Sequence, residues 1–216
     1  MTPHRKALVL DFGGVLTTPL LPAALAFENR EGLAEGTLLT RLYLDPEGIR
    51  INEELERGAL TQSQWNEAAA ALLGIPPDNL MGRIFADLRP EPSVIAAAAA
   101  ARRAGVRVGI LSNSVGLTPW NLYDGYEVEK RYDAVVLSED HGTRKPEPEM
   151  FRLVLGELGL TAEECVFVDD TEQHLAPAAD LGFATVHAVD PARTVAALEA
   201  LLGIPLRDKD PDRVTA

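Results

Sequence analysis

Three aspartates in the chain come directly after apolar runs. Asp11 follows residues 7–10, and Asp169 and Asp170 follow residues 165–168. An uninterrupted apolar run of this length predicts a strand that is buried on both faces, as in a parallel sheet. A carboxylate at the end of such a strand lies at the edge where open α/β sheets bind ligands. Taken alone, the stretch around Asp11 also fits a strand that simply ends in a polar turn.

These carboxylates predict a cation site if their strands are neighbours. Like charges that lie close together raise one another's pKa unless a cation lies among them. Mg²⁺ prefers oxygen ligands, takes one or two carboxylates, and keeps other positions for water and substrate phosphate. Asp11 and Asp170 supply that number of carboxylates. An aspartate placed in this way can also attack phosphorus and form an aspartyl-phosphate.

Groups that suit a phosphate occur at two other places. Ser112 and Asn113 follow the predicted strand 106–111, and the Ser112 hydroxyl can donate to a phosphate oxygen. The backbone N–H groups of Phe12-Gly13-Gly14 can donate in the same way. Lys145 offers a compact positive charge for the phosphate or for a carboxylate nucleophile. We therefore predict that all these residues, Asn113 included, bind phosphate.

The elements that position these residues follow an α/β pattern after residue 88. Further strands are predicted over 134–137 and 184–187, and helices over 92–104, 146–158 and 190–202. This alternation predicts a doubly wound parallel sheet with right-handed crossovers and helices on both faces. The polar residues that follow the strands then meet at one edge of the sheet.

The segment 17–87 contains helical patterns only. One helix is predicted to begin at Thr61, which forms a capping box with Gln64. Structureless loops of this length are uncommon, so we predict an all-helical cap over residues 17–87. The α/β core then comprises residues 1–16 and 88–206, and the charged tail 207–216 is expected to be disordered.

Composition limits the classes of partner. The formal net charge of −13 over 216 residues argues against binding to nucleic acid or to an anionic membrane. Cys165 is the only cysteine, which excludes an intrachain disulfide and fits a reducing compartment. No apolar run is long enough for a signal-peptide core or a membrane span. We expect a cytoplasmic protein, and the sequence does not predict its oligomeric state.

The chemistry-bearing segments together resemble the four motifs of the haloacid dehalogenase (HAD) superfamily, in order. They are Asp11-Phe12-Gly13-Gly14-Val15-Leu16, Leu111-Ser112-Asn113, Lys145-Pro146-Glu147-Pro148 and Val168-Asp169-Asp170. The helical insertion looks like the C1-type cap of subfamily I. Residues 55–61 and 144–148 are similar to the phosphatase domains of soluble epoxide hydrolases and to bacterial sugar-phosphate phosphatases.

The resemblance implies a Mg²⁺-dependent phosphatase that hydrolyses a small phosphorylated metabolite through an aspartyl-phosphate. By this resemblance Asp11 is the nucleophile and a metal ligand, and Lys145 neutralises charge. Ser112 binds the phosphate, and Asp170 binds the metal. The resemblance also implies that the backbone carbonyl of Gly13 binds the metal. It implies that Asp169 either contacts the metal ligands or is itself a ligand.

Gly13 departs from the phosphatase pattern Asp-x-Asp, whose second aspartate acts as general acid and base. His174 is one candidate to supply the missing proton, and His141 is a weaker one. Two alternatives stay open: a metal-free hydrolase of the dehalogenase type, and a non-catalytic protein that binds a phosphorylated ligand. The pair Asp169-Asp170 argues against the metal-free alternative, because two adjacent carboxylates have little purpose there without a cation.

Overall fold

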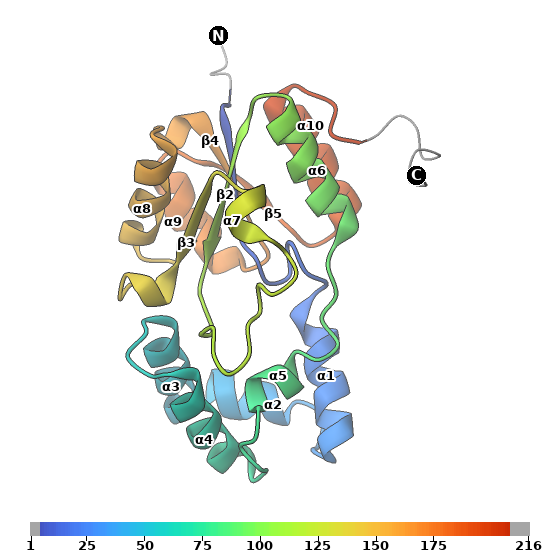
Figure 1. The fold of residues 1–216 in the computed structure, drawn as a ribbon, viewed down its shortest axis with the longest axis vertical. Helices are drawn as coiled ribbons and strands as arrows, with labels where there is room; N and C mark the ends of the chain where they lie inside the picture. The colour runs from blue at the N-terminus through green and yellow to red at the C-terminus, as the bar shows by residue number, and fades with distance from the viewer. Residues whose placement is uncertain (1–4, 208–216) are drawn as a thin grey trace.

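The computed structural model describes residues 5–207 and consists of an α/β layer structure beside a group of helices (Figure 1). The predicted disordered tail lies outside the described residues, except for Arg207. The five strands are β1 (Ala7–Leu10), β2 (Arg107–Ser112), β3 (Ala134–Leu137), β4 (Cys165–Asp169) and β5 (Ala184–His187). All their pairings are parallel, in the order β3-β2-β1-β4-β5. The predicted doubly wound sheet is confirmed.

The register brings the ends of the three central strands to one level. Leu10 at the end of β1 pairs with Ile110 of β2 and with Val168 of β4. Asp11 therefore follows level with Asp169, and Ser112 lies one residue further along. The polar residues that the sequence places after separate strands come together for this reason.

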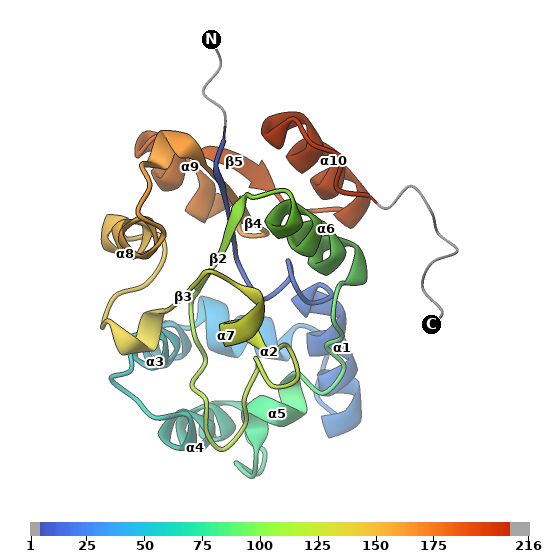
Figure 2. The ribbon, with the colours of Figure 1, turned by 45° about the horizontal axis from the view of Figure 1, so that its top comes forward.

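Helices cover both faces of the sheet (Figures 1 and 2). On one face lie α6 (Pro92–Arg103) and α10 (Pro191–Leu202), and on the other α8 (Pro148–Leu158) and α9 (Glu172–Asp180). Successive residues of β1 alternate between the two hydrophobic cores, with Leu8 and Leu10 in the first core and Ala7 and Val9 in the second. Burial on both faces explains the uninterrupted apolar run of the strand.

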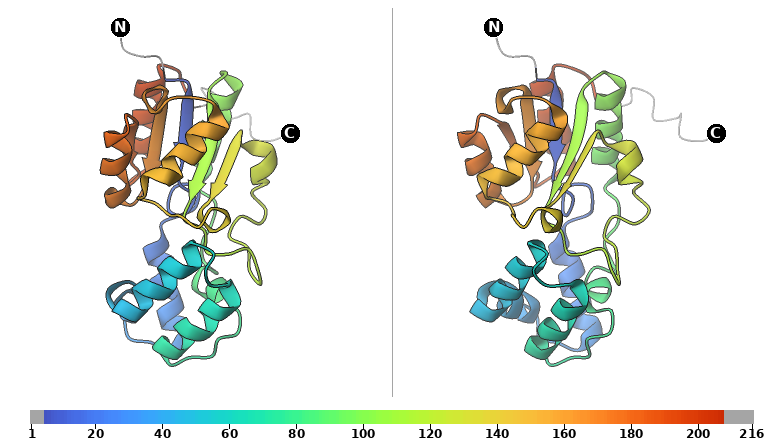
Figure 3. Two further views of the ribbon diagram at one scale, coloured as in Figure 1. Left: turned by 90° about the vertical axis from the view of Figure 1, so that its left-hand side faces the viewer. Right: turned by 60° about the vertical axis from the view of Figure 1, so that its left-hand side comes forward.

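A separate hydrophobic cluster is formed by the helices between β1 and α6, together with Val115 and Trp120. These helices are α1 (Leu20–Glu31), α2 (Thr37–Leu39), the π-helix η1 (Thr40–Leu44), α3 (Pro46–Glu56), α4 (Gln62–Leu73) and α5 (Leu80–Ile84). Thr61 caps α4 in the predicted capping box. The carboxyl ends of the strands point toward this group (Figure 3). The group thus stands over the sheet edge where the predicted site residues meet.

Three short helices complete the described chain: α7 (Val128–Arg131) and the 3₁₀-helices η2 (Ser138–Asp140) and η3 (Ala162–Glu164). The two segments that connect the helical group to the sheet pair with each other in one antiparallel bridge, Thr17 with Pro90. In this bridge Glu91 N donates to Leu16 O and Thr18 N donates to Arg89 O. The boundaries of the cap at residues 17 and 87 stay a prediction. Within residues 5–207, no helix is both long and apolar enough to cross a membrane.

Two helical glycines provide a test of how α3 packs. A Cβ on Gly48 of α3 would lie 2.6 Å from Leu42 Cα and closer still to Arg41 O, both backbone atoms of η1. A Cβ on Gly156 of α8 would meet nothing within 4 Å. Gly48→Ala should lower the free energy of unfolding by about 1–3 kcal/mol through overpacking. Gly156→Ala should raise it by about 0.5–1 kcal/mol. Denaturant unfolding of both variants checks this packing, and equal effects would contradict it.

Candidate active site

Lys145 joins the two central strands that end in aspartate. Its side chain is 1% exposed, and its Nζ lies 2.8 Å from Asp11 Oδ1 and 2.7 Å from Asp169 Oδ2. Asp11 follows β1 and Asp169 ends the neighbouring β4, while Lys145 enters from the loop before α8. A buried ammonium is tolerated only when it is well paired, and two carboxylates pair it here.

The charges in this cluster shift one another's pKa values. Burial raises the pKa of Asp11 to about 7, because Lys145 only partly offsets it and the charges of Asp169 and Asp170 add to the rise. Burial acts on Asp169 as well, but Lys145 and His174 hold its pKa below the usual range. Desolvation of Lys145 is outweighed by the two carboxylates, which raise its pKa and keep it an ammonium.

The third carboxylate, Asp170, completes an acidic cluster. One carboxylate oxygen from each of Asp11, Asp169 and Asp170 lies within 4.8 Å of the others. Three carboxylates around one ammonium leave an excess of negative charge, which a divalent cation would offset. Asp169 is already engaged by Lys145 Nζ, by Thr171 N at 2.8 Å and by His174 Nδ1 at 3.0 Å. Asp11 and Asp170 are the freer donors, so the cluster fits Mg²⁺.

Two glycines bring the chain close to this cluster. Gly14 has a φ of 71°, and a Cβ on it would lie 2.7 Å from Asp170 Cγ, so only glycine fits. Gly13 has no such restriction, since its Cβ would meet Leu20 Cδ2 at 3.6 Å. Two of the backbone N–H groups predicted for phosphate have internal partners: Phe12 N donates to Asp11 Oδ1 and Gly14 N to Thr17 Oγ1.

Ser112 lies at the end of β2 with its hydroxyl oriented by a residue that the sequence analysis did not assign to the site. Tyr123 donates its hydroxyl to Ser112 Oγ at 2.9 Å. Burial raises the pKa of Tyr123, so it stays a proton donor. Since Ser112 Oγ accepts this bond, its own proton is available to another acceptor. The Tyr123 ring also packs edge-on against Phe12, with centroids 4.6 Å apart.

Asn113 holds the backbone of Lys145. Its Oδ1 accepts from Lys145 N at 2.7 Å, and its Nδ2 donates to Lys145 O at 3.1 Å. The side-chain amide is therefore used to place the lysine. The phosphate-binding role of Asn113 stays a prediction.

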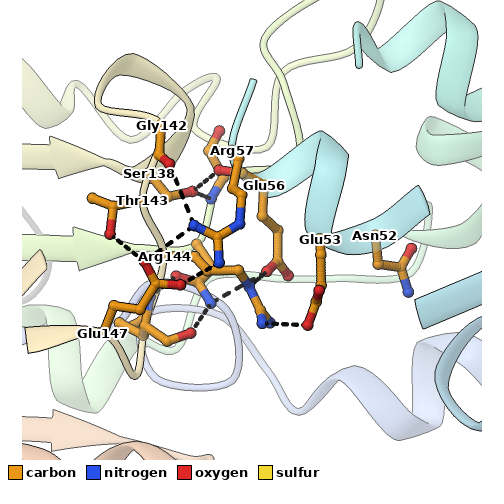
Figure 4. A network of polar contacts seen from close by, with 12 residues as sticks. Asn52, Glu53, Glu56, Arg57, Ser138, Gly142, Thr143, Arg144 and Glu147 are labelled. Carbon is orange, nitrogen blue, oxygen red and sulfur yellow. Dashed lines mark hydrogen bonds and ion pairs between the residues drawn. The ribbon is translucent and has the colours of Figure 1, made fainter. Parts of the chain in front are cut away.

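A polar network ties the end of α3 to the loop that carries Lys145 (Figure 4). Arg144 binds Glu56 through its Nε and Glu53 through its Nη1. Arg57 reaches both carboxylate oxygens of Glu147. Ser138 donates to the carbonyl of Glu56. Residues 55–61 and 144–148 resemble segments of related phosphatases, but their sequences do not indicate that the two segments are in contact.

The two histidines considered as proton donors differ in position. His174 lies beside the cluster, with Nδ1 3.0 Å from both carboxylate oxygens of Asp169. The partner of the His174 ring is thus Asp169 and not Asp11. His141 is exposed in the loop after η2.

The family model of haloacid dehalogenase-like hydrolases matches residues 5–182, so the chain belongs to this family and is a hydrolase. The chain is 28% identical to bifunctional epoxide hydrolase 2 of Rattus norvegicus over 218 residues. That match covers 92% of this chain and 39% of the relative, so the chain spans about two fifths of that protein's length. It is 24% identical to sesquiterpene phosphatase astK of Aspergillus oryzae, with 92% and 97% covered.

A solved structure has the same fold. It is the HAD family enzyme bt-2542 of Bacteroides thetaiotaomicron in a magnesium complex. The TM-score is 0.64 at 22% identity, and the match covers 85% of this chain and 92% of that one.

The close approach of Gly14 to Asp170 gives a matched pair of substitutions. Gly14→Ala should destabilise the protein by about 1–3 kcal/mol, because the methyl group strains the backbone and displaces the carboxylate. It should also abolish any rise in melting temperature caused by Mg²⁺. Gly13→Ala should preserve both properties. Thermal unfolding with and without MgCl₂ measures them, and a Gly14→Ala variant that behaves like wild type would contradict the geometry.

Proposed function

We propose that this hydrolase is a Mg²⁺-dependent phosphatase that cleaves small phosphate monoesters through an aspartyl-phosphate. The observation that carries the proposal is the buried contact of Lys145 with Asp11, next to the Asp170 carboxylate and an oriented Ser112 hydroxyl. The phosphatase named among the relatives and the magnesium complex of the structural neighbour add support.

The reaction proceeds in two displacements at phosphorus. A carboxylate oxygen of Asp11 forms a bond to phosphorus, and the bond from phosphorus to the ester oxygen breaks. The ester oxygen keeps the electron pair and takes a proton from solvent, so that the leaving group departs as the alcohol. Water then attacks phosphorus and gives up a proton to solvent, the bond to Asp11 breaks, and the carboxylate and inorganic phosphate are released. Splitting the reaction in this way replaces one difficult step by two easier ones.

The chain's own residues supply the positioning and the charge. Lys145 stays positively charged and offsets repulsion between the Asp11 carboxylate and an anionic phosphate. Ser112 donates its free proton to a phosphate oxygen. Asp11, Asp170 and the Gly13 carbonyl would hold Mg²⁺, with Asp169 behind them, and the ion would supply positive charge at the phosphate oxygens. The excess of carboxylates favours this over a metal-free dehalogenase reaction.

The first test removes the nucleophile. Asp11→Asn should fold normally and lose at least ~10³-fold in rate on an aryl phosphate, because covalent chemistry is abolished. The control Asp140→Asn changes an exposed aspartate in η2 and should keep full activity. EDTA should stop wild-type turnover. If Asp11→Asn keeps more than a tenth of the wild-type activity, Asp11 is not the nucleophile. Full activity in EDTA would favour the dehalogenase alternative, and phosphate binding without turnover would favour a non-catalytic protein that binds a phosphorylated ligand.

A second test addresses the proton that Gly13 cannot donate. General acid catalysis typically contributes ~10²–10⁴-fold and matters most for strongly basic leaving groups. Wild-type kcat/KM should therefore fall steeply as leaving-group pKa rises. Gly13→Asp should flatten the slope, since a Cβ at this position makes only ordinary contact with Leu20. A flat wild-type line, in an assay where chemistry limits the rate, would mean that another proton donor already acts.

A further inference from the structure

An apolar cleft opens between α1, the α2–η1 segment and the end of α5. Its volume is about 400 Å³, and its walls include Leu20, Leu21, Leu25, Leu39, Tyr43 and Phe85. Leu21 is 61% exposed, and Leu39 and Tyr43 are each 50% exposed, so large apolar side chains border open space here. Exposed apolar patches of this kind mark binding surfaces more often than single scattered residues do.

One residue of the α1 wall, Leu20, lies between the cleft and the candidate active site. Leu20 lines the cleft, and its Cδ2 lies 3.6 Å from the position of a Cβ on Gly13. Gly13 is two residues from Asp11 in sequence and stands where the phosphatase pattern has its second aspartate. If the leaving group of the ester departs on the side of Gly13, it therefore contacts the Leu20 side chain.

A second connection runs through the centre of the helical group. A small cavity of about 30 Å³ is lined by Glu56 and Val115 and shares four wall residues with the cleft, namely Leu38, Tyr43, Ile84 and Phe85. Glu56 approaches Asn113, the residue that holds the Lys145 backbone. The inner cavity thus lies between the cleft and the catalytic cluster.

Tyr43 has the environment expected at such a junction. Tyr43 lines both the cleft and the inner cavity, and half of its surface is accessible. It therefore forms part of the wall that the two spaces share.

The cleft offers few partners for polar groups. Two acidic residues, Glu28 and Glu35, are among the lining residues. The Glu28 carboxylate accepts from Gly36 N and Leu38 N at the start of α2, and Glu35 is exposed. Most of the remaining lining is apolar, so most hydroxyl groups of a sugar would lose their water here without replacement hydrogen bonds, at a cost of about 1–3 kcal/mol each. The cleft therefore suits a hydrocarbon group better than a sugar.

We propose that the cleft binds the leaving group of the substrate, and that the substrate is a phosphate monoester of a large apolar alcohol or phenol. This inference rests on the proposed phosphatase function. An apolar cavity of about 150 Å³ takes one benzene molecule, so 400 Å³ accommodates roughly 12–16 carbon atoms.

The test is a series of 4-alkylphenyl phosphates from methyl to nonyl, assayed below the concentrations at which they form micelles. Their leaving-group pKa values are nearly constant, so the chemical step stays the same. We expect kcat/KM to rise by up to about fourfold per methylene until the cleft is filled. A rate that does not change with chain length would overturn the proposal, and so would a preference for sugar phosphates.

Two arginine substitutions locate the effect. Leu39→Arg puts a charge in the cleft wall and should lower kcat/KM at least tenfold for the nonyl substrate but not for the methyl one. Leu44→Arg changes a 65% exposed leucine of the same segment that is not in the cleft wall, and should leave both values unchanged. Leu25→Arg should act like Leu39→Arg. Equal effects of Leu39→Arg and Leu44→Arg would overturn the assignment.

Two further measurements separate the cleft from the chemistry. Calorimetry with Asp11→Asn should show that affinity for the 4-alkylphenyl phosphates rises with the length of the alkyl chain. If affinity rises in this way while wild type releases no phosphate, the binding role of the cleft is supported and the phosphatase function is contradicted. Sedimentation should show the same association state for wild type and Leu39→Arg. A wild-type dimer that Leu39→Arg dissociates, with no chain-length effect, would show that the cleft is a subunit interface instead.

Discussion

The ammonium of Lys145 between two carboxylates is the interaction on which the site depends. It lies inside the protein between Asp11 and Asp169, whose mutual repulsion would otherwise raise the free energy of the folded state. The contact also sets the path of the chain, because the loop before α8 must approach the ends of β1 and β4. Removing the lysine would leave two buried carboxylates uncompensated, whereas removing the charge of Asp11 leaves Lys145 paired with Asp169.

The surrounding structure holds this lysine from two sides. Asn113 binds both the N–H and the carbonyl of Lys145, so the end of β2 fixes its backbone. On the other side, Arg144 links the same loop to Glu56 at the end of α3 (Figure 4). The helical group is therefore joined to the buried charge cluster by ion pairs, whereas its interior offers apolar walls. Under the two proposals, the polar groups for a phosphate and the apolar surface for a leaving group belong to different parts of one chain.

The sequence predicts correctly those features whose signal is local. Buried strands appear as apolar runs, and the residues that follow two of these runs identify the edge of the sheet where Asp11, Asp169 and Asp170 meet. Tyr123 could not be predicted in this way, because its contact with Ser112 depends on the path of a long loop. Helix α3 was missed although Asp45 and Pro46 form a cap and a first turn at its start. Helix α9 was missed as well, and it carries Pro177 in its interior.

The most direct test of the central claim is a crystal structure of the protein with Mg²⁺ and beryllium trifluoride, which mimics an aspartyl-phosphate. We expect beryllium bonded to a carboxylate oxygen of Asp11, fluorides in contact with Lys145 Nζ and Ser112 Oγ, and Mg²⁺ held by Asp11 and Asp170. Beryllium on any other residue, or Mg²⁺ bound away from these two carboxylates, would contradict the account.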